Sequence, residues 1–408
     1  MKCRHCQAEL SLSLMDLGSS PPSNAYLTEK TLNAPEKYFP LRVLVCTECW
    51  LVQTEDYASA DELFSAEYAY FSSFSTTWLE HAERYVADMA KRFGLGAQSL
   101  IVEVAANDGY LLQYARAQGI PCLGIEPTAS TAAAARAKGI EIVEDFFGVK
   151  LAEELVANGK QADLIAANNV LAHVPDINDF VAGFSRLLKP TGIATFEFPH
   201  LLRLVSENQF DTIYHEHYSY LSLTATKRIF EHNGLSVFDV EELPSHGGSL
   251  RVYAQRMGLG VRAPSQSVEA LLAREAKAGV ATSEYYTGFQ EKANRVKNDF
   301  ISFLIEANKA GKSVAGYGAA AKGNTLLNYA GVRPDLLFYV VDRNPAKQDK
   351  FLPGCRIPVF KEEQLRLSKP DYVVILPWNL RAEVADQISY IREWGGKIVT
   401  AVPVLKVG

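Results

Sequence analysis

Short apolar runs alternate with helical patterns between residues 99 and 200. Residues 100–104 form a run of the kind that becomes a buried strand, and a helix is predicted to follow from Tyr110. Further strands are predicted over residues 122–125, 140–143, 163–167 and 193–198, with helices over residues 128–138 and up to residue 188. Short apolar strands that alternate with helices form parallel sheets with both faces covered. This region therefore predicts a doubly wound α/β domain.

A second region of the same kind begins near residue 313. Its strands are predicted over residues 313–318, 337–342, 372–376 and 397–399, and the first of them runs into a glycine turn. Between the two regions the pattern predicts a helix over residues 224–233 and strands over residues 235–240 and 250–255. The charged stretch over residues 265–310 predicts helix. Its Gly, Ala and Lys content indicates a connector between domains rather than an element of a core.

Chain length sets the number of domains. The first 57 residues are rich in turns and short strands, and residues 61–95 have a helical pattern. At 408 residues the chain is too long for one ordinary hydrophobic core. We therefore expect three domains, over residues 1–60, 61–262 (with the helical lead-in) and 263–408 (with the connector).

Composition and charge exclude several classes of partner. The net charge is −6 and the isoelectric point is near 5.8, and no dense stripe of Lys and Arg occurs, which argues against nucleic acid. No apolar run is long enough to span a bilayer, which argues against a membrane partner. The amino terminus lacks the apolar segment of a signal peptide. We expect a cytoplasmic monomer.

Two close pairs of cysteines lie in the first 49 residues: Cys3 with Cys6, and Cys46 with Cys49. Two residues between thiols let one turn present both sulfurs to a tetrahedral ion, and two such turns complete four ligands. A site with four thiolates has no open position, so we predict a structural zinc ion. A redox pair or a chance spacing is the alternative.

The end of the first predicted strand leads into a polar turn at Glu103, Ala105, Asn107 and Asp108. In open parallel sheets, ligands bind beyond the carboxyl ends of the strands, so this turn is the expected position of a cofactor. It lacks the G-x-G-x-x-G fingerprint of a pyrophosphate site, which disfavours NAD at this position.

Polar and aromatic residues follow the next three strands as well. Glu126 ends the second strand, where a carboxylate can accept both hydroxyls of a ribose, and Asp145 and Phe146 follow the third, placed to bind and cover an adenine. Asn168 follows the fourth. Each signal alone is weak, because Glu126 could be a surface carboxylate and Phe146 a core residue. Together they favour an adenosyl cofactor.

The densest polar cluster follows the fifth strand, at residues 210–218. His217 beside Glu216 can act as a general base, and the Tyr214 hydroxyl can stabilise an oxyanion. Two alternatives remain: His215 and His217 could bind a metal, or the segment could be an ordinary buried polar network. His173 projects from the end of the fourth strand into the same region, where a lone histidine is more often structural.

A second glycine turn spans residues 316–323 and contains Tyr317 and Lys322. Backbone N–H groups at the start of a helix, with a lysine, suit a phosphate or pyrophosphate. Asn379, at the end of a later strand, is expected to face the same crevice. The alternative is that the glycines only permit close packing.

These motifs, in this order, resemble the sugar C-3-methyltransferase family, which acts on dTDP-linked 4-keto-deoxy sugars. The resemblance covers nearly the whole chain. It rests on the cysteine pairs, the turn at residues 103–109, the segment at residues 216–218, the run from His246 through Gly247 and Gly248 to Arg251, and the glycine turn at residues 316–322. It implies a zinc-binding N-terminal domain, a central Rossmann-like domain that binds S-adenosylmethionine (SAM), and a second Rossmann-like α/β domain.

The resemblance also implies residue roles. His217 would remove the proton from C3 of the sugar, which the neighbouring C4 ketone makes acidic, and Glu216 and Tyr214 would support the enolate. Tyr70 and His173 would line the sugar pocket. The substrate would be bound by His246, Arg251, Tyr317, Lys322 and Asn379. One departure from many SAM enzymes concerns the cofactor turn, because Ala105 and Ala106 stand where those enzymes usually have glycine.

Two other classes of function compete with this interpretation. An NAD-dependent oxidoreductase acting on a nucleotide sugar would use the second glycine turn for a dinucleotide and Asp342 for its ribose, but would leave the polar series at residues 103–146 unexplained. A non-enzymatic docking protein would use the zinc domain to bind a partner. The acidic net charge weighs against this second class.

Overall fold

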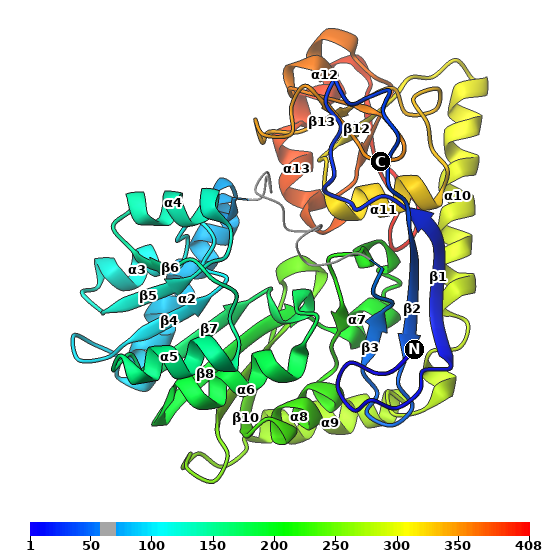
Figure 1. Cartoon of the computed structure of the whole chain (residues 1–408). Coiled ribbons are helices and arrows are strands. Elements are labelled where there is room, and N and C mark those ends of the chain that lie inside the picture. Colours follow the sequence, from blue (N-terminus) through cyan, green and yellow to red (C-terminus); the bar gives the residue numbers. More distant parts are fainter. Residues whose placement is uncertain (58–70) are drawn as a thin grey trace.

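Three β-sheets organise the chain in the computed structural model, which describes residues 1–57 and 71–408 (Figure 1). A four-stranded sheet near the N-terminus lies beside two seven-stranded sheets. The sequence predicted this division into α/β units and a small N-terminal unit. Among the described residues, no helix combines the length and the apolar character that crossing a membrane requires.

The central sheet has the order β10-β11-β8-β7-β4-β5-β6. Its strands are β4 (Ile101–Val104), β5 (Cys122–Ile125), β6 (Glu141–Val143), β7 (Ala162–Asn168), β8 (Leu188–Pro199), β10 (Leu235–Leu243) and β11 (Ser249–Arg256). Strands β4 to β8 are parallel, which confirms the predicted parallel sheet. Strand β11 inserts antiparallel between β8 and β10, because a short connection joins β10 to β11 as a hairpin.

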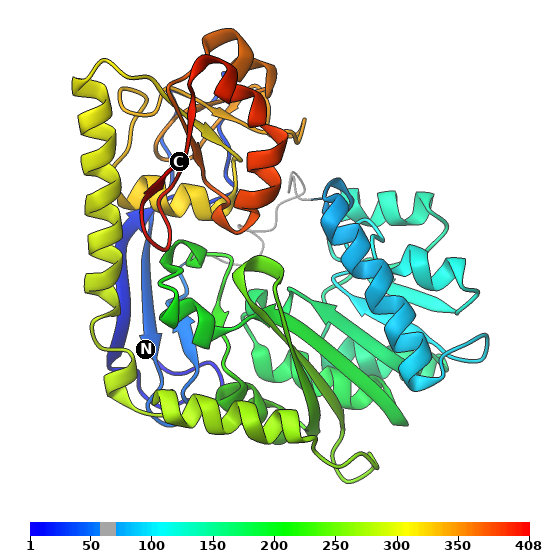
Figure 2. The same ribbon diagram turned by 180° about the vertical axis from the view of Figure 1, so that it is seen from behind.

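Helices cover both faces of this sheet (Figures 1 and 2). They are α2 (Thr76–Phe93), α3 (Leu112–Ala117), α4 (Ala129–Ala137), α5 (Val149–Ala157), α6 (Ile177–Leu187) and α8 (Leu223–His232). Helix α7 (Leu201–Ser206) follows β8 and packs instead in the core that contains the N-terminal sheet. Aromatic side chains from α6, β8 and α8 pack in the core, with ring centroids 4.5 Å apart for Phe184 and Phe196 and 4.6 Å for Phe196 and Phe230. Helix α2 accounts for most of the described part of the stretch predicted to be helical over residues 61–95, and Ser72–Phe74 within that stretch form a 3₁₀ turn instead.

The N-terminal sheet contains β1 (Leu12–Ser20), β2 (Phe39–Val45), β3 (Val52–Thr54) and β9 (Ser219–Tyr220), all antiparallel in that order. Strand β9 lies more than 160 residues downstream of β3 and directly follows the predicted catalytic segment. Gln53 pairs with Ser219 and Val52 with Tyr220. The small N-terminal sheet therefore holds the end of the catalytic segment in place.

The C-terminal sheet has the order β14-β15-β13-β12-β16-β17-β18. Its strands are β12 (Val314–Tyr317), β13 (Val340–Val341), β14 (Lys350–Phe351), β15 (Pro358–Phe360), β16 (Tyr372–Ile375), β17 (Lys397–Thr400) and β18 (Lys406–Val407). Its helices are α11 (Ala321–Tyr329), α12 (Glu363–Ser368) and α13 (Arg381–Gln387). The strand predicted over residues 337–342 is reduced to two residues, because only Val340 and Val341 pair with both neighbouring strands.

The stretch over residues 265–310 is two helices, α9 (Gln266–Ala278) and α10 (Phe289–Lys309). Gly279 and Gly288 adopt positive φ, which ends one helix and starts the next. Helix α10 runs along the outer side of the molecule from the N-terminal sheet to the C-terminal unit (Figures 1 and 2). The prediction that this stretch contributes to no core is wrong, because α10 buries apolar residues at helical spacing against β1 and α11: Phe289, Ala293, Val296, Phe300 and Leu304.

Short 3₁₀ helices complete the described chain: η1 (Ser72–Phe74), η2 (Leu171–His173), η3 (Phe210–Thr212), η4 (Ser245–Gly247), η5 (Ser283–Tyr285), η6 (Trp378–Leu380) and η7 (Ser389–Trp394). Four of them, η2, η3, η4 and η6, carry or adjoin predicted site residues. Helices η2, η4 and η6 follow strands, and η3 begins the predicted catalytic segment.

Candidate active site and metal centre

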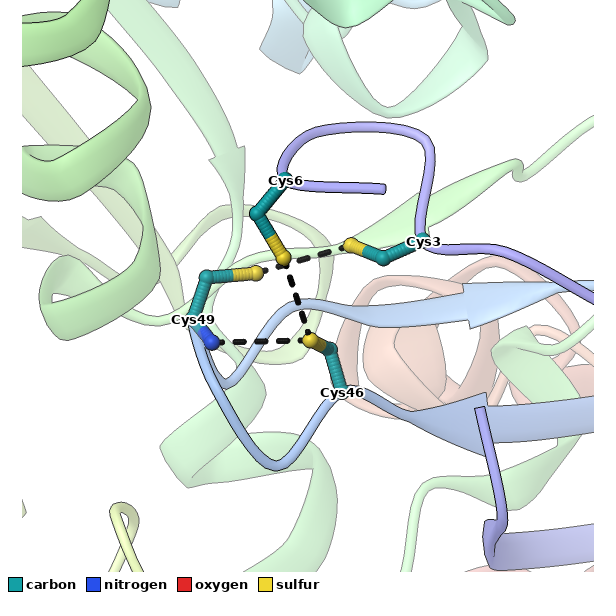
Figure 3. Close-up of side chains that lie close together, drawn as sticks. All are labelled: Cys3, Cys6, Cys46 and Cys49. Atoms are coloured by element: carbon teal, nitrogen blue, oxygen red, sulfur yellow. Dashed lines mark hydrogen bonds between the residues drawn. The ribbon is translucent and has the colours of Figure 1, made fainter. Parts of the chain in front are cut away.

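The four predicted zinc ligands lie together (Figure 3). The Sγ atoms of Cys3 and Cys49 are 3.5 Å apart, those of Cys6 and Cys46 are 3.4 Å apart, and all four lie within 4.8 Å of one another. Zinc–sulfur bonds of about 2.3 Å put the sulfurs of a tetrahedral site roughly 3.8 Å apart, so the cluster fits the ion. None of these thiols forms a disulfide.

Each cysteine pair lies on a tight turn. Gln7 N–H donates to the Cys3 carbonyl at 3.0 Å, and Trp50 N–H donates to the Cys46 carbonyl at 2.9 Å. Gln7 and Trp50 both have φ of 63°, the left-handed conformation that closes each turn. Both halves of the site are thus formed by the protein backbone.

The predicted cofactor turn contains residues with left-handed backbone and a tightly packed glycine. Ala105 has φ of 58° and Asn107 has φ of 50°, which explains why glycine is usual at the first of these positions. An added Cβ at Gly109 would collide with Ile140. Burial raises the pKa of Glu103 well above its ordinary value, and neither of its carboxyl oxygens has a hydrogen-bond partner among the described residues. Asp108 is buried beside Lys138, whose Nζ lies 3.5 Å from Asp108 Oδ2.

Glu126 lies where the sequence predicted a ribose partner, at the end of β5. Its Oε2 accepts the N–H of Asn107 at 2.9 Å and its Oε1 accepts the N–H of Thr128 at 2.9 Å. Each carboxylate oxygen has further lone pairs, so these bonds orient the carboxylate without saturating it. Asn168, at the end of β7, is 7% exposed, and its amide nitrogen and oxygen make no hydrogen bond within the described chain.

Asp145 and Phe146 follow β6 and lie at the surface. Phe146 is 54% exposed, and Asp145 Oδ1 accepts the Phe146 N–H at 2.7 Å. An exposed aromatic ring beside a cofactor turn has the freedom to cover a bound base. Sequence predicted both residues from their place after the third strand, and the structure keeps them on the same edge of the sheet as Glu126.

His217 is buried, and its Nδ1 lies 2.9 Å from the carbonyl oxygen of Thr212. A carbonyl oxygen only accepts hydrogen bonds, so Nδ1 carries the proton and Nε2 carries the lone pair. Burial lowers the pKa of His217 well below its ordinary value, and the nearby His173 lowers it further. The ring therefore stays neutral near pH 7.

The other predicted catalytic residues gather around His217. The ring centroid of Tyr214 lies 3.9 Å from that of His217, and the centroid of His173 lies 4.6 Å from it. His173 Nδ1 lies 2.8 Å from the Glu216 carbonyl oxygen, and burial lowers the pKa of His173 to about 4. Tyr70 lies outside the described residues.

Glu216 faces the N-terminal unit. Its Oε1 accepts a hydrogen bond from Asn24 Nδ2 at 3.1 Å, and burial raises the pKa of its carboxyl group. His215 turns in another direction, with its Nε2 3.2 Å from the Phe39 carbonyl oxygen. His215 and His217 therefore bond to different main-chain groups, which does not favour the alternative that they bind one metal.

His246 lies in the connection between β10 and β11 and has φ of 56°. Its ring packs edge-on against Trp78, with centroids 5.1 Å apart, and Trp78 also stacks on Tyr110 at 5.8 Å. Burial lowers the pKa of His246 to about 4. Trp78 thus lies between the cofactor turn and the His246 loop, a position that sequence analysis did not predict.

Arg251 forms salt bridges with two carboxylates of the protein. Its Nη2 lies 2.8 Å from Glu197 Oε2 and its Nη1 lies 3.0 Å from Glu241 Oε2, with only 4% of the side chain exposed. His81 Nε2 lies 2.9 Å from Glu197 Oε2 as well. Burial alone would raise the pKa of Glu197, but His81 and Arg251 outweigh it and lower the pKa to about 2.

The signal that could have identified Glu197 was present in the sequence. It is a charged residue near the carboxyl end of an otherwise apolar strand, where burial demands a partner. Its partner His81 could not be identified in this way, because it lies 116 residues away on another element.

N–H groups of the second glycine turn already donate hydrogen bonds to other groups of the protein. Gly318 N–H donates to the Val341 carbonyl at 2.8 Å, and Ala319 N–H donates to Asp342 Oδ2 at 2.7 Å. Asp342 is the residue that a dinucleotide would need for its ribose, and it is already bonded to the turn. This geometry does not favour the oxidoreductase alternative.

Lys322 and Asn379 lie together, as predicted, with Lys322 Nζ 2.8 Å from Asn379 Oδ1. The ammonium also lies 4.9 Å from the ring centroid of Trp378, and burial lowers its pKa. Tyr317 points elsewhere: its hydroxyl lies 3.1 Å from Glu362 Oε2 and from Gln387 Oε1, beside α12 and α13.

Trp378 joins the C-terminal unit to the catalytic segment. Its Nε1 donates to Asp211 Oδ2 at 2.8 Å, and its ring occupies the space beside Gly247, where an added Cβ would lie 2.5 Å from Trp378 Cη2. Burial raises the pKa of Asp211 to about 6, although the nearby Lys322 opposes this shift. Three loops from two units therefore meet at this indole.

Comparison with known proteins gives matches along the chain. Residues 3–64 match a family model described as "Putative zinc binding domain", residues 78–240 one for a methyltransferase domain, and residues 244–403 one for a C-methyltransferase C-terminal domain. C-methyltransferase NovU of Streptomyces niveus is 34% identical over 402 residues, which cover 98% of this chain and 95% of that protein.

Other relatives match only part of the chain. The ubiquinone biosynthesis O-methyltransferase of Rhodopseudomonas palustris (strain TIE-1) is 27% identical over 151 residues, 31% of this chain and 59% of that protein. Among solved structures, the magnesium protoporphyrin IX methyltransferase of Synechocystis PCC 6803 aligns with a TM-score of 0.34 and 16% identity, over 44% of this chain and 79% of that one. The identification rests on the full-length relative and the family models. The chain belongs to the sugar C-methyltransferase family of SAM-dependent enzymes and carries the zinc-binding N-terminal domain of that family.

Proposed function

We propose that the enzyme transfers a methyl group from SAM to C3 of a nucleotide-linked 4-keto-deoxy sugar, with dTDP as the nucleotide and His217 as the general base. The observation that carries this proposal is the state of His217: a neutral ring with its proton on Nδ1, enclosed by His173 and Tyr214. A ring carbon beside a ketone is acidic enough for such a base.

The base works through Nε2. The Thr212 carbonyl fixes the tautomer, so the lone pair of Nε2 is available to accept the proton from the sugar carbon. Burial makes the neutral ring the stable form before reaction. The imidazolium that forms on proton transfer is balanced by the negative charge that develops on the substrate.

That negative charge resides on the enolate oxygen. The raised pKa of Glu216 keeps more of its carboxyl group protonated, and a protonated carboxyl group can donate a hydrogen bond to an enolate. The hydroxyl of Tyr214, whose ring lies against His217, is a second donor at this position. Tyr70 and His173 are assigned to the walls of the sugar pocket.

SAM supplies an electrophilic methyl group on a sulfonium when it is bound. The positive φ values of Ala105 and Asn107 let the chain pass close to it, and Glu103 and Asp108 lie in the same turn. The oriented carboxylate of Glu126 is assigned to the ribose hydroxyls. Asp145 and Phe146 are assigned to the adenine, and the unpaired amide of Asn168 to a polar group of the cofactor.

The nucleotide diphosphate is assigned to the start of α11, with Lys322 and Asn379. His246 is assigned to the substrate directly, because its loop borders Trp78 and the cofactor turn. Arg251 and Tyr317 already have protein partners for their polar atoms. These two residues are assigned a supporting role, holding β11 and the second glycine turn in place.

The test uses the purified, zinc-loaded enzyme with a dTDP-linked 4-keto-6-deoxyhexose. With SAM present, we expect S-adenosylhomocysteine and a sugar with one added carbon-bound methyl group, detected by mass spectrometry. Without SAM, in deuterium oxide, we expect exchange of the C3 hydrogen, detected by NMR. Exchange at C5 instead would move the reaction to the other side of the ketone, and no exchange at either carbon would overturn the role of His217.

A further inference from the structure

Arg4 lies between two zinc-ligand cysteines. Its side chain points away from the cysteine cluster and contacts residues that adjoin the two predicted catalytic histidines. Only 5% of this side chain is exposed. Its Nη2 donates to the Thr54 carbonyl at 2.8 Å, and its Nη1 lies 3.2 Å from the Pro175 carbonyl oxygen. The guanidinium lies 5.2 Å from the ring centroid of Tyr218.

These contacts join the two loops that carry the histidines. Pro175 lies two residues after His173, and Tyr218 directly follows His217. The loops also bond to each other, because Tyr218 N–H donates to the Ala172 carbonyl at 2.8 Å. Arg4 therefore contacts the main chain just beyond His173 and the aromatic side chain just beyond His217, and the ring centroids of these two histidines lie 4.6 Å apart.

A second path leads from the metal cluster to His217 through strand β3. Gln53 Nε2 lies 3.3 Å from Cys3 Sγ, and Gln53 Oε1 accepts the Arg4 N–H at 2.9 Å. The next residue, Thr54, donates its hydroxyl to the His217 carbonyl at 3.1 Å and its N–H to the Tyr218 carbonyl at 3.1 Å. Two consecutive residues thus connect a ligand sulfur to the main chain of the proposed base.

We propose that Arg4 and Thr54 are positioning residues for His217, so that the first cysteine turn fixes the place of the base as well as folding its own domain. This inference rests on the proposed function. Its physical reason is that proton abstraction needs the reacting atoms near contact distance, and a displacement of about 1 Å can lower the rate by roughly a hundredfold. Hydrogen bonds to the main-chain carbonyls of Pro175, His217 and Tyr218 oppose such a displacement.

The first test replaces the guanidinium. Arg4→Lys keeps the positive charge near Asp56 but replaces two nitrogens, Nη2 bonded to the Thr54 carbonyl and Nη1 bonded to the Pro175 carbonyl, with a single ammonium on a shorter chain without the fork. We expect SAM-independent exchange of the sugar hydrogen to fall about tenfold to a hundredfold, with kcat falling by the same factor. Zinc content and SAM affinity should stay unchanged.

A matched control exists at the second cysteine turn. Arg228 on α8 donates from Nη1 to the Glu48 carbonyl, which lies between Cys46 and Cys49. It touches the other half of the metal site but neither histidine loop. Arg228→Lys should therefore leave exchange, kcat and zinc content as they are.

The second test separates positioning from folding. Thr54→Val removes the hydroxyl bond to the His217 carbonyl but keeps the branched shape of the side chain and its strand N–H. Thr54→Ser keeps the hydroxyl. We expect the valine variant to lose several-fold in exchange rate and the serine variant to regain most of it, because one hydrogen bond is worth about a factor of ten at most here.

A third measurement does not depend on the substrate. In protein with ¹⁵N-labelled histidine, the ring nitrogen signals of His217 and His173 should move in Arg4→Lys and stay in Arg228→Lys. Unchanged signals together with unchanged exchange in Arg4→Lys would overturn the inference while the proposed function stands. Absence of exchange in the unaltered enzyme would overturn the proposed function, and the inference with it.

Discussion

The chemistry of His217 depends on which ring nitrogen meets the main chain. The Thr212 carbonyl accepts a hydrogen bond from the protonated Nδ1, and burial favours the uncharged ring. Its neighbour His215 bonds to the Phe39 carbonyl through Nε2 instead. Two histidines separated by one residue therefore have different hydrogen-bond partners, so substitution of His215 can serve as a control for substitution of His217.

We expect His217→Gln to lower turnover by about a hundredfold to ten-thousandfold, the usual contribution of general-base catalysis. SAM affinity, measured by calorimetry, should be unaffected. His215→Gln is the matched control, because glutamine keeps a donor for the Phe39 carbonyl. Equal losses in both variants would show that the segment acts only through its fold.

The pH dependence of kcat/KM should follow from the lowered pKa of His217. The neutral ring is the active form, so activity is present above the folded-state pKa and is lost as pH falls through it. Because that pKa lies below the ordinary value of about 6.5, we expect no loss of activity from protonation of His217 between about pH 8 and pH 6.5. An acidic limb centred at or above pH 6.5 would contradict this assignment.

Glu126 provides a test at the cofactor. Glu126→Gln removes the charge while keeping the side chain's size, and we expect SAM binding to weaken by about 1.5–3 kcal/mol, the worth of a hydrogen bond to a charged group. Calorimetric titration measures this change. Glu144→Gln, which alters an exposed carboxylate paired with Arg136 nearby, is the control and should leave SAM affinity unchanged.

At the scale of elements, a contact between a carboxylate and a histidine connects strand β8 to helix α2. Glu197 on β8 bonds to His81 on α2 and to Arg251 on β11. This attachment sets the position of the first turn of α2, where Trp78 lies between Tyr110 and His246. A buried carboxylate thus helps to fix the distance between the predicted cofactor turn and the His246 loop.

Replacing this carboxylate should destabilise the protein. Glu197→Gln leaves the buried Arg251 without its main counter-charge, and we expect a loss of about 3–5 kcal/mol in urea unfolding at pH 7. The pKa of Glu197 is lowered to about 2, so its contribution is present above the ordinary carboxyl value and is lost as pH falls towards 2. The stability difference between the two proteins should therefore shrink in acid. A stability difference that stays constant as pH falls would contradict the lowered pKa of Glu197.

Sequence predicted the elements whose patterns are local. The strands of the central sheet are short apolar runs with turns beside them, and the cysteine pairs are recognised by spacing alone. Strand β9 could not be predicted, because two residues have no period, and its pairing with β3 is fixed by tertiary contacts. The break between α9 and α10 was marked by Gly279 and Gly288, but a single glycine within a helical pattern is an ambiguous signal.

The site was predictable to a similar degree. The shared location of side chains that follow successive strands, such as Glu126 and Asn168, was predictable because the topology of a parallel sheet brings strand ends together, and their roles towards a cofactor stay predictions. Contacts between units were not, because nothing local marks them: Thr54 bonds to a residue 163 positions away, and Trp378 to one 167 positions away. Arg251 illustrates a further limit, since a sequence motif does not tell whether an arginine meets substrate or a carboxylate of the protein.

At the scale of the whole molecule, the metal cluster belongs to a shared core. Cys3, Cys46, Cys49 and Leu51 pack in the same buried cluster as residues of the central sheet, such as Val102. Four close thiolates would repel one another without a cation. Loss of the ion should therefore disturb contacts beyond the N-terminal sheet.

We expect about one zinc ion per chain by elemental analysis. Cys46→Ser should lose the ion and have a lower melting temperature. Cys122→Ser changes a thiol outside the cluster and should keep the zinc ion and the melting temperature of the unaltered protein. Chelation should abolish turnover. A zinc-free protein with an unchanged melting temperature would contradict a structural role.

The crossing of the chain at β9 constrains how relatives can exchange parts. Three strands of the N-terminal sheet come from the first 57 residues, but the fourth comes from residues 219–220. A recombination event near residue 64, where the first family match ends, would therefore pair three strands of one parent with the fourth strand of another. Gene chimeras that carry residues 210–222 along with the N-terminal segment should keep their methylation activity, and those that cut between them should lose it. The segments that we expect to be exchanged together in this enzyme are thus discontinuous in the gene.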